Sequence, residues 1–180
     1  MHPGFSELAR WANFYVIVGS SAGALTGLQF VVITLVAQAR AIGSGQEIRA
    51  FATPTVVHFC AALIISALMS SPWDDPVVLA VGVGVFGVAG FLYSFRVIYH
   101  ARQQNGYAPD ASDWFWFIAL PLVAYAALAS AGFFLVWNAR VCLWLIATVI
   151  LLLVIIGIRN AWDTVTYVTL RNQAAFRGSR

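Results

Sequence analysis

Long stretches without a charged side chain dominate the pattern of polar and apolar positions along the chain. Five such stretches, of 29, 24, 20, 26 and 18 residues, cover residues 11–39, 50–73, 76–95, 114–139 and 141–158. A helix that crosses the apolar core of a bilayer needs about 20 mostly apolar residues, with a range of about 17–25. The pattern therefore predicts an all-α integral membrane protein with five transmembrane helices, at approximately 12–37, 52–71, 76–101, 114–137 and 141–162.

The composition agrees with this prediction, because 61% of the 180 residues are hydrophobic and only 9% are charged. Soluble domains average about 45–50% apolar and about 25% charged residues. We therefore exclude a water-soluble domain and expect a single transmembrane domain that spans residues 1–180. The sequence has no phosphate-binding loop, dinucleotide-binding fingerprint, zinc-protease motif or nucleophile elbow. We expect no enzymatic activity, no cofactor and no bound metal, so any function has to come from residues in or beside the spans.

The orientation follows from arginine alone, because the chain has no lysine. Five spans place the termini on opposite sides of the membrane, and short cytoplasmic loops carry the excess of Lys and Arg. Arg10 and Arg140 fall on one side, and the other eight arginines fall on the opposite side. The N-terminus is therefore predicted outside and the C-terminus in the cytoplasm. This bias also accounts for the net charge of +3, so a nucleic-acid partner is not expected.

The first span carries a stripe of small residues. Gly19, Gly23 and Gly27 repeat every four residues and so lie on one face of a helix. Ser20 and Thr34 fall near the same face. Small residues at this spacing let two helix backbones approach closely in lipid. Three interpretations stay open: packing within the subunit, association between subunits or with another membrane protein, and the wall of a water-filled path.

The second span carries an ionisable side chain on a polar face. Thr55, His58 and Ser66 share one face at 100° per residue. An ionisable residue inside a span is by default a functional hypothesis, because leaving it in lipid is costly. On the functional interpretation, His58 binds a ligand, relays a proton or senses pH. On the structural interpretation, it is a neutral histidine that bonds to a neighbouring backbone or hydroxyl group.

Charged residues gather at both ends of the spans. Asp74 and Asp75 lie in the predicted outer turn, where they either concentrate cations around an oligomer or form a solvated turn. Arg96 and His100 lie at the predicted inner end of the third span. There they either form an anion-attracting vestibule or anchor the helix to lipid headgroups.

Two further features of the later spans are expected to be structural. Arg159 and Asp163 are four residues apart on one helix face, so we expect them to form an ion pair. Pro121 lies inside the fourth span, where it should kink the helix or free a backbone carbonyl.

The start of the first span resembles a known family. Trp11-Ala12-Asn13-Phe14-Tyr15, followed by Gly19-Ser20-Ser21-Ala22-Gly23-Ala24-Leu25-Thr26-Gly27-Leu28-Gln29-Phe30-Val31, is similar to the opening of small bacterial multi-span proteins labelled "modulator of FtsH protease". The similarity covers roughly the first quarter of the chain. The resemblance implies a multi-pass protein of the bacterial cytoplasmic (inner) membrane that acts by contacting a membrane protease. It carries over no catalytic or binding residue.

These observations lead to two functional hypotheses. The first is a homo-oligomeric channel or pathway for small solutes or ions, because five thin helices enclose little space alone and a pore would lie at a symmetry axis. Its predicted lining is Ser20, Gly23, Gly27, Thr34, Thr55, His58 and Ser66, with Asp74 and Asp75 at the outer mouth and Arg96 and His100 at the inner mouth. The second is a regulatory or scaffolding protein that binds another membrane protein through the face of Gly19, Gly23 and Gly27.

Overall fold

The computed structural model is a bundle of long helices. It describes residues 8–38, 45–102 and 114–178, with side chains at 8–34, 53–99 and 114–166. The elements, in chain order, are α2 (Ala12–Gln38), α3 (Gly45–Ser70), α4 (Pro76–Arg102), the short π-helix η1 (Phe115–Ala119), α6 (Leu120–Phe134) and α7 (Ala139–Gly178). These described ranges contain no strand, so the predicted all-α fold class is confirmed there.

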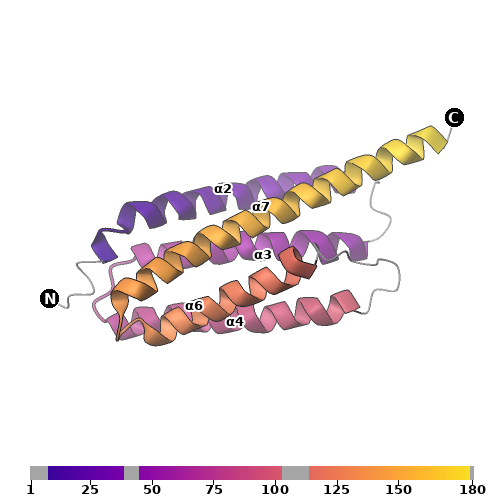
Figure 1. Ribbon diagram of the computed structural model, residues 1–180. Helices are drawn as coiled ribbons and strands as arrows, with labels where there is room; N and C mark the ends of the chain where they lie inside the picture. Colours follow the sequence, from indigo (N-terminus) through magenta and orange to yellow (C-terminus); the bar gives the residue numbers. More distant parts are fainter. Residues whose placement is uncertain (1–7, 39–44, 103–113, 179–180) are drawn as a thin grey trace.

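The long helices lie side by side along one direction, as Figure 1 shows. Helix α3 contacts α2, α4 and α7, and α6 contacts α4 and α7. We call the end of the bundle that holds the turns at 71–75 and 135–138 the N-terminal end, and the opposite end the C-terminal end. Helix α7 crosses the others obliquely and continues past them at the C-terminal end (Figure 1).

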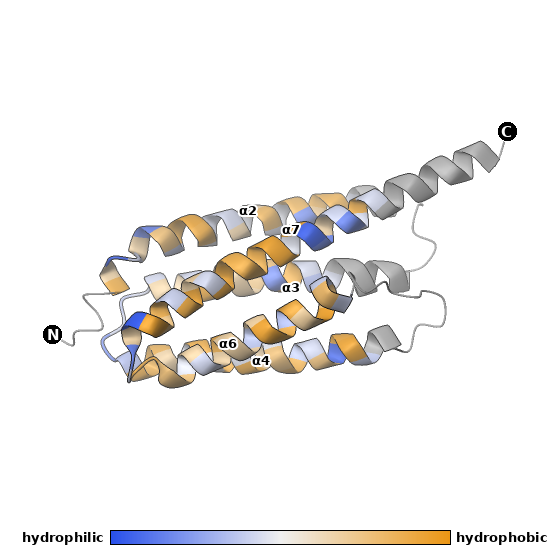
Figure 2. Cartoon of the chain, in the orientation of Figure 1, coloured by the Kyte–Doolittle hydropathy of each residue, from blue (hydrophilic) through white to orange (hydrophobic). Residues whose placement is uncertain are grey.

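Five helices are long and apolar enough to cross a membrane, as the sequence predicts. The candidate spans are Ala12–Thr34, Thr53–Ser70, Pro76–Tyr99, Phe115–Phe134 and Ala139–Thr166. Apolar residues run along all of these helices, and blue, hydrophilic residues lie near several helix ends, within α3 and about midway along α7 (Figure 2). Large apolar side chains such as Ile17, Val85 and Phe133 are exposed on the outside of the bundle, as a lipid environment requires.

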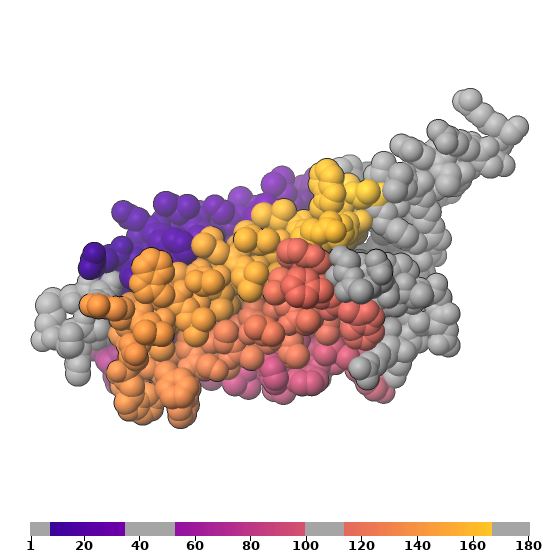
Figure 3. All heavy atoms as spheres, viewed as in Figure 1, coloured from indigo at the N-terminus to yellow at the C-terminus, as the bar shows by residue number. Residues whose placement is uncertain are grey.

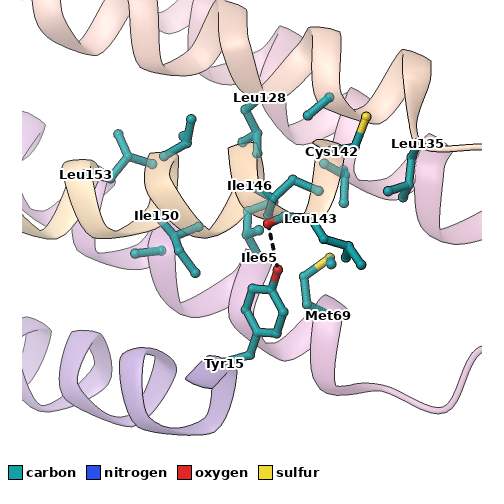
Figure 4. Packing of buried hydrophobic residues seen from close by; sticks show 14 of the residues in the cluster. Tyr15, Ile65, Met69, Leu128, Leu135, Cys142, Leu143, Ile146, Ile150 and Leu153 are labelled. Carbon is teal, nitrogen blue, oxygen red and sulfur yellow. Dashed lines mark hydrogen bonds between the residues drawn. The ribbon is translucent and has the colours of Figure 1, made fainter. Parts of the chain in front are cut away.

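The apolar core fills the half of the bundle nearer the N-terminal end. Tyr15, Ile65, Met69, Leu143 and Ile146 pack together there from α2, α3 and α7 (Figure 4). The Tyr15 hydroxyl points at the backbone carbonyl of Leu143, at 3.5 Å. This long contact joins α2 to α7, which run in the same direction.

Proline shapes the start of the fourth span. Pro121 has no N–H to donate to the preceding turn, and its ring crowds the carbonyl of the residue four places earlier. The turn directly before it is the π-helix η1, in which the Leu120 N–H donates to the carbonyl of Phe115. The wider turn relieves the crowding, so the effect of Pro121 takes the form of a local π-helix. A second buried proline, Pro54, lies inside α3.

Helices α4 and α6 touch through glycine. A Cβ built on Gly132 would overlap the backbone of Gly84, and a Cβ on Gly87 would overlap the backbone of Ala129. Side chains at these positions would force the two helices apart. Close backbone approach of this kind is the usual basis of helix association in lipid.

We predict that Gly132→Ala destabilises the protein by about 1–3 kcal/mol, the usual cost of overpacking a tight contact. Thermal unfolding in detergent, followed by circular dichroism, measures the change. Gly27→Ala is the matched control, because a Cβ there meets no heavy atom within 4 Å. The control should match or slightly exceed the wild-type midpoint, since alanine favours helix over glycine. Equal midpoints for Gly132→Ala and wild type would contradict the close contact.

Candidate functional site

Among the buried polar side chains of the described residues, five come from four different helices and lie near one height along the bundle. We call them the polar layer: Gln29 of α2, Thr55 and His58 of α3, Tyr125 of α6 and Asn160 of α7. Each has 3% or less of its surface exposed. Burial of polar groups in an apolar bundle is costly unless they are hydrogen-bonded, so their gathering needs an explanation.

His58 and Tyr125 form the centre of the layer. The Nδ1 atom of His58 lies 3.0 Å from the Tyr125 hydroxyl, which is a good hydrogen-bond distance. The two rings are tilted, with centroids 5.8 Å apart. A Cβ on Gly90 would overlap the ring of Tyr125, so the missing side chain in α4 makes the room that Tyr125 occupies. The tautomer of His58 decides which of the two groups donates.

Helix contacts place Gln29 at the same height along the bundle as His58. Helices α2 and α3 run in opposite directions, and Gly23 of α2 lies against the side chain of Leu63. Gln29 follows Gly23 by six residues, so it comes opposite residue 57, beside His58.

Asn160 reaches this height from α7. A Cβ on Gly157 would lie 2.5 Å from the ring of Phe59, so these two residues face each other across antiparallel helices. Asn160 follows Gly157 by three residues and therefore comes opposite residue 56, next to Thr55. Along the bundle axis, the contacts on both sides of α3 thus place all five residues within about one turn of helix of one another.

Two members of the layer lack hydrogen-bond partners. The Nε2 atom of Gln29 and both side-chain atoms of Asn160, Nδ2 and Oδ1, are buried and meet no partner within the described residues. An unsatisfied buried polar group costs about 1–3 kcal/mol. The backbone carbonyl of Asn160, by contrast, accepts a bond from the Thr164 hydroxyl at 2.8 Å. The layer therefore offers hydrogen-bonding capacity that its own side chains do not use.

The charged residues nearest to Asn160 along α7 are paired with each other. Arg159 donates to Asp163, as the sequence spacing predicts, and both side chains stay partly exposed. The pair therefore neutralises its own charge beside the layer.

The predicted lining residues divide between the interior and the surface of the subunit. Thr55, His58 and Ser66 are buried. Ser20, Gly27 and Thr34 are exposed on α2, and Gly23 is half-buried beside Leu63. In a single subunit, these residues do not line one surface.

The three glycines of α2 also differ in surroundings. A Cβ on Gly19 would lie 2.9 Å from the Cβ of Ser66, so Gly19 is buried against α3 of the same chain. The Ser66 hydroxyl there has no partner within the described residues. Gly27 faces open space.

The predicted mouth residues lie near the ends of the bundle. Asp74 and Asp75 are exposed in the 71–75 turn, and an Asp75 carboxylate oxygen accepts the backbone N–H of Val77 at 2.8 Å. Asp75 thus caps the start of α4. Arg96 is exposed near the C-terminal end, and the side chain of His100 lies outside the described side chains.

Sequence reasoning missed Gln29, Tyr125 and Asn160 as site residues. Gln29 and Tyr125 stand in apolar stretches, Asn160 directly follows Arg159 at the end of one, and no spacing links any of them to His58. The signal that could have found them is that an amide inside a span is as exceptional as a histidine. Tyr125 also stands in the middle of its span, away from the interfaces where tyrosine is common.

No group of three or more His, Cys, Asp or Glu side chains that could hold a metal ion occurs in the part of the chain that the structure describes. Comparison with protein-family models gives no match, and comparisons with curated proteins and with solved structures give none either.

We predict that Tyr125→Phe lowers the free energy of unfolding by about 1–3 kcal/mol, because it leaves Nδ1 of His58 buried without its partner. Equilibrium unfolding in detergent measures the loss. Tyr15→Phe is the matched control: Tyr15 is equally buried, but its hydroxyl makes only the 3.5 Å contact. A loss from Tyr15→Phe as large as that from Tyr125→Phe would show that the His58–Tyr125 bond adds nothing specific.

Proposed function

We propose that the protein is a membrane pathway for a small solute or ion, in which the polar layer is the binding step. The observation that carries this proposal is the gathering of polar side chains from four helices at one depth, with hydrogen-bonding groups left unused. Polar groups inside a membrane bundle are expensive and typically mark substrate or ion paths. A purely structural histidine needs one partner, which Tyr125 supplies, and does not need buried amides at the same height in α2 and α7.

The apolar core blocks access to the polar layer from the N-terminal end of the bundle. Between the polar layer and the N-terminal end stand Ile65, Met69, Leu143 and Ile146, all nearly fully buried. A polar solute cannot pass such a region without a movement of the helices. We therefore propose that the solute reaches the layer from the C-terminal end, which is the cytoplasmic side in the orientation predicted from the arginines.

The hydroxyl groups on the outer surface favour an interior path over a pore between subunits. Ser21, Thr34, Ser130 and Thr148 are exposed, and each donates to the backbone carbonyl four residues earlier in its own helix. Hydroxyl groups satisfied in this way suit contact with lipid or with another helix. They leave little polar capacity for lining a water-filled axis.

We predict that His58→Ala and Tyr125→Phe each lower solute flux about tenfold, equivalent to ~1.4 kcal/mol at the limiting step. Purified protein in lipid vesicles is tested by stopped-flow light scattering for uncharged solutes and by ion-sensitive dyes for ions. Ser130→Ala is the control, since it removes an exposed hydroxyl of α6 that bonds to its own helix. Wild-type flux equal to that of empty vesicles for every solute would remove the proposal.

A second candidate function is binding of another membrane protein, or of a second copy of this chain, through the outer face of α2. Ser20, Ala24 and Gly27 are exposed together on this face, and a Cβ on Gly27 would meet nothing within 4 Å. This face would let another helix approach closely. The resemblance of the first span makes a membrane protease one partner to test.

For this candidate we predict that Gly27→Leu weakens association at least tenfold without unfolding the protein, because the leucine side chain fills the contact. Energy transfer between donor- and acceptor-labelled chains in vesicles measures self-association, and co-purification with a membrane protease measures the hetero-complex. Val85→Leu, an exposed apolar change on α4, is the control. Unchanged association of the Gly27→Leu variant in both assays would exclude this face.

A further inference from the structure

We propose that the polar layer binds a small uncharged molecule that both donates and accepts hydrogen bonds, water being the smallest member of this class. The inference deepens the proposed function and rests on it for the transport step. Binding to the layer is nevertheless a property of the resting protein, so binding and transport can be tested separately.

The unpartnered atoms define the hydrogen-bonding character of the ligand. Nε2 of Gln29 and Nδ2 of Asn160 are donors, and Oδ1 of Asn160 is an acceptor. A ligand that satisfies them has to accept from the N–H groups of both amides and donate to the amide oxygen of Asn160. Water, urea and small polyols do both, whereas an apolar molecule does neither.

The absence of formal charge among the five side chains defines the charge of the ligand. The layer consists of two amides, a hydroxyl, a phenol and an imidazole, and Arg159 and Asp163 beside it neutralise each other. Transfer of an ion into such a site costs several kcal/mol that no opposite charge repays. An uncharged solute avoids this cost.

Close helix contacts define the size of the ligand. The ring of Phe59 lies tightly against Gly157, and the ring of Tyr125 fills the place of a side chain on Gly90. These contacts hold the helices together at the height of the layer. Helices held this close leave no room for a large metabolite between them, so we restrict the proposed ligand to water or a solute of about the size of urea.

Occupancy is tested on the full chain in lipid nanodiscs by NMR, with ¹⁵N-labelled side-chain amides. We expect cross-peaks to water, or to added urea, at the side-chain amides of Gln29 and Asn160. Asn138, which is exposed at the N-terminal end, is the positive reference for contact with water. Amide signals of Gln29 and Asn160 that contact neither water nor urea would overturn the inference.

A stability measurement gives an independent test of occupancy. If the layer is filled, Asn160→Leu and Gln29→Met each remove bonds to the bound molecule and lower the unfolding midpoint. The double variant should then lose less than the sum of the two, because both amides bind the same molecule or chain of molecules. If the layer is dry, both substitutions remove an unsatisfied polar group and raise the midpoint, which would also overturn the inference.

Flux assays in vesicles distinguish a failure of this inference from a failure of the proposed function. In vesicles we expect swelling driven by water or urea to exceed that of empty vesicles, and Asn160→Leu to lower it about tenfold, while sodium and chloride do not pass. Passage of ions without water or urea would overturn the uncharged ligand and leave a pathway in place. NMR contacts at both amides without any flux would support the binding site and remove the pathway.

Discussion

The ring of Tyr125 occupies the place of a side chain on Gly90, and the ring of Phe59 does the same at Gly157. In lipid the hydrophobic effect does not drive helices together, so such interlocking of rings and glycines has to hold them. Each contact also fixes the height of one helix against its neighbour. The polar layer depends on this constraint, because His58 meets Tyr125 only while α3, α4, α6 and α7 keep these heights.

The bundle combines two halves with opposite physical character. Towards the N-terminal end, aliphatic side chains and the aromatic ring of Tyr15 pack into an apolar core, and α2, α6 and α7 cover this half on the face in view (Figure 3). Towards the C-terminal end, polar side chains enter the interior. A chain selected for stability alone would continue the apolar packing, since Asn160 and Gln29 leave polar atoms unsatisfied within the described residues. The proposed bound molecule would satisfy these atoms.

The five helices were predictable from sequence because a bilayer imposes its requirement on each segment separately. A span has to be apolar and long enough whatever its neighbours are, so charge-free stretches locate it. The pairing of Arg159 with Asp163 was predictable for the same reason, since it depends on one helix alone. These features need no knowledge of tertiary structure.

The site was predictable only in part, because it depends on the relative heights of different helices. The shared face of Thr55, His58 and Ser66 is a property of α3, and all three residues are buried as one interior face. The partners of His58 come from other helices, and nothing in the spacing of Gln29, Tyr125 and Asn160 shows that they meet it. The surroundings of the glycine stripe likewise depend on the other helices. Gly19 lies against Ser66, whereas Gly27, two turns further along the same face, faces open space.

The two buried prolines both lie on the same side of the polar layer. Pro54 precedes His58 by four residues in α3, and Pro121 precedes Tyr125 by four residues in α6. Both therefore lie one turn from the hydrogen-bonded pair, on the side of the C-terminal end. Each removes one backbone hydrogen bond from its helix, and at Pro121 the adjoining turn is already a π-helix. On the other side of the pair the helices are unbroken and packed in the apolar core. The backbones of α3 and α6 are therefore less restrained next to Pro54 and Pro121 than in the core on the opposite side of the layer.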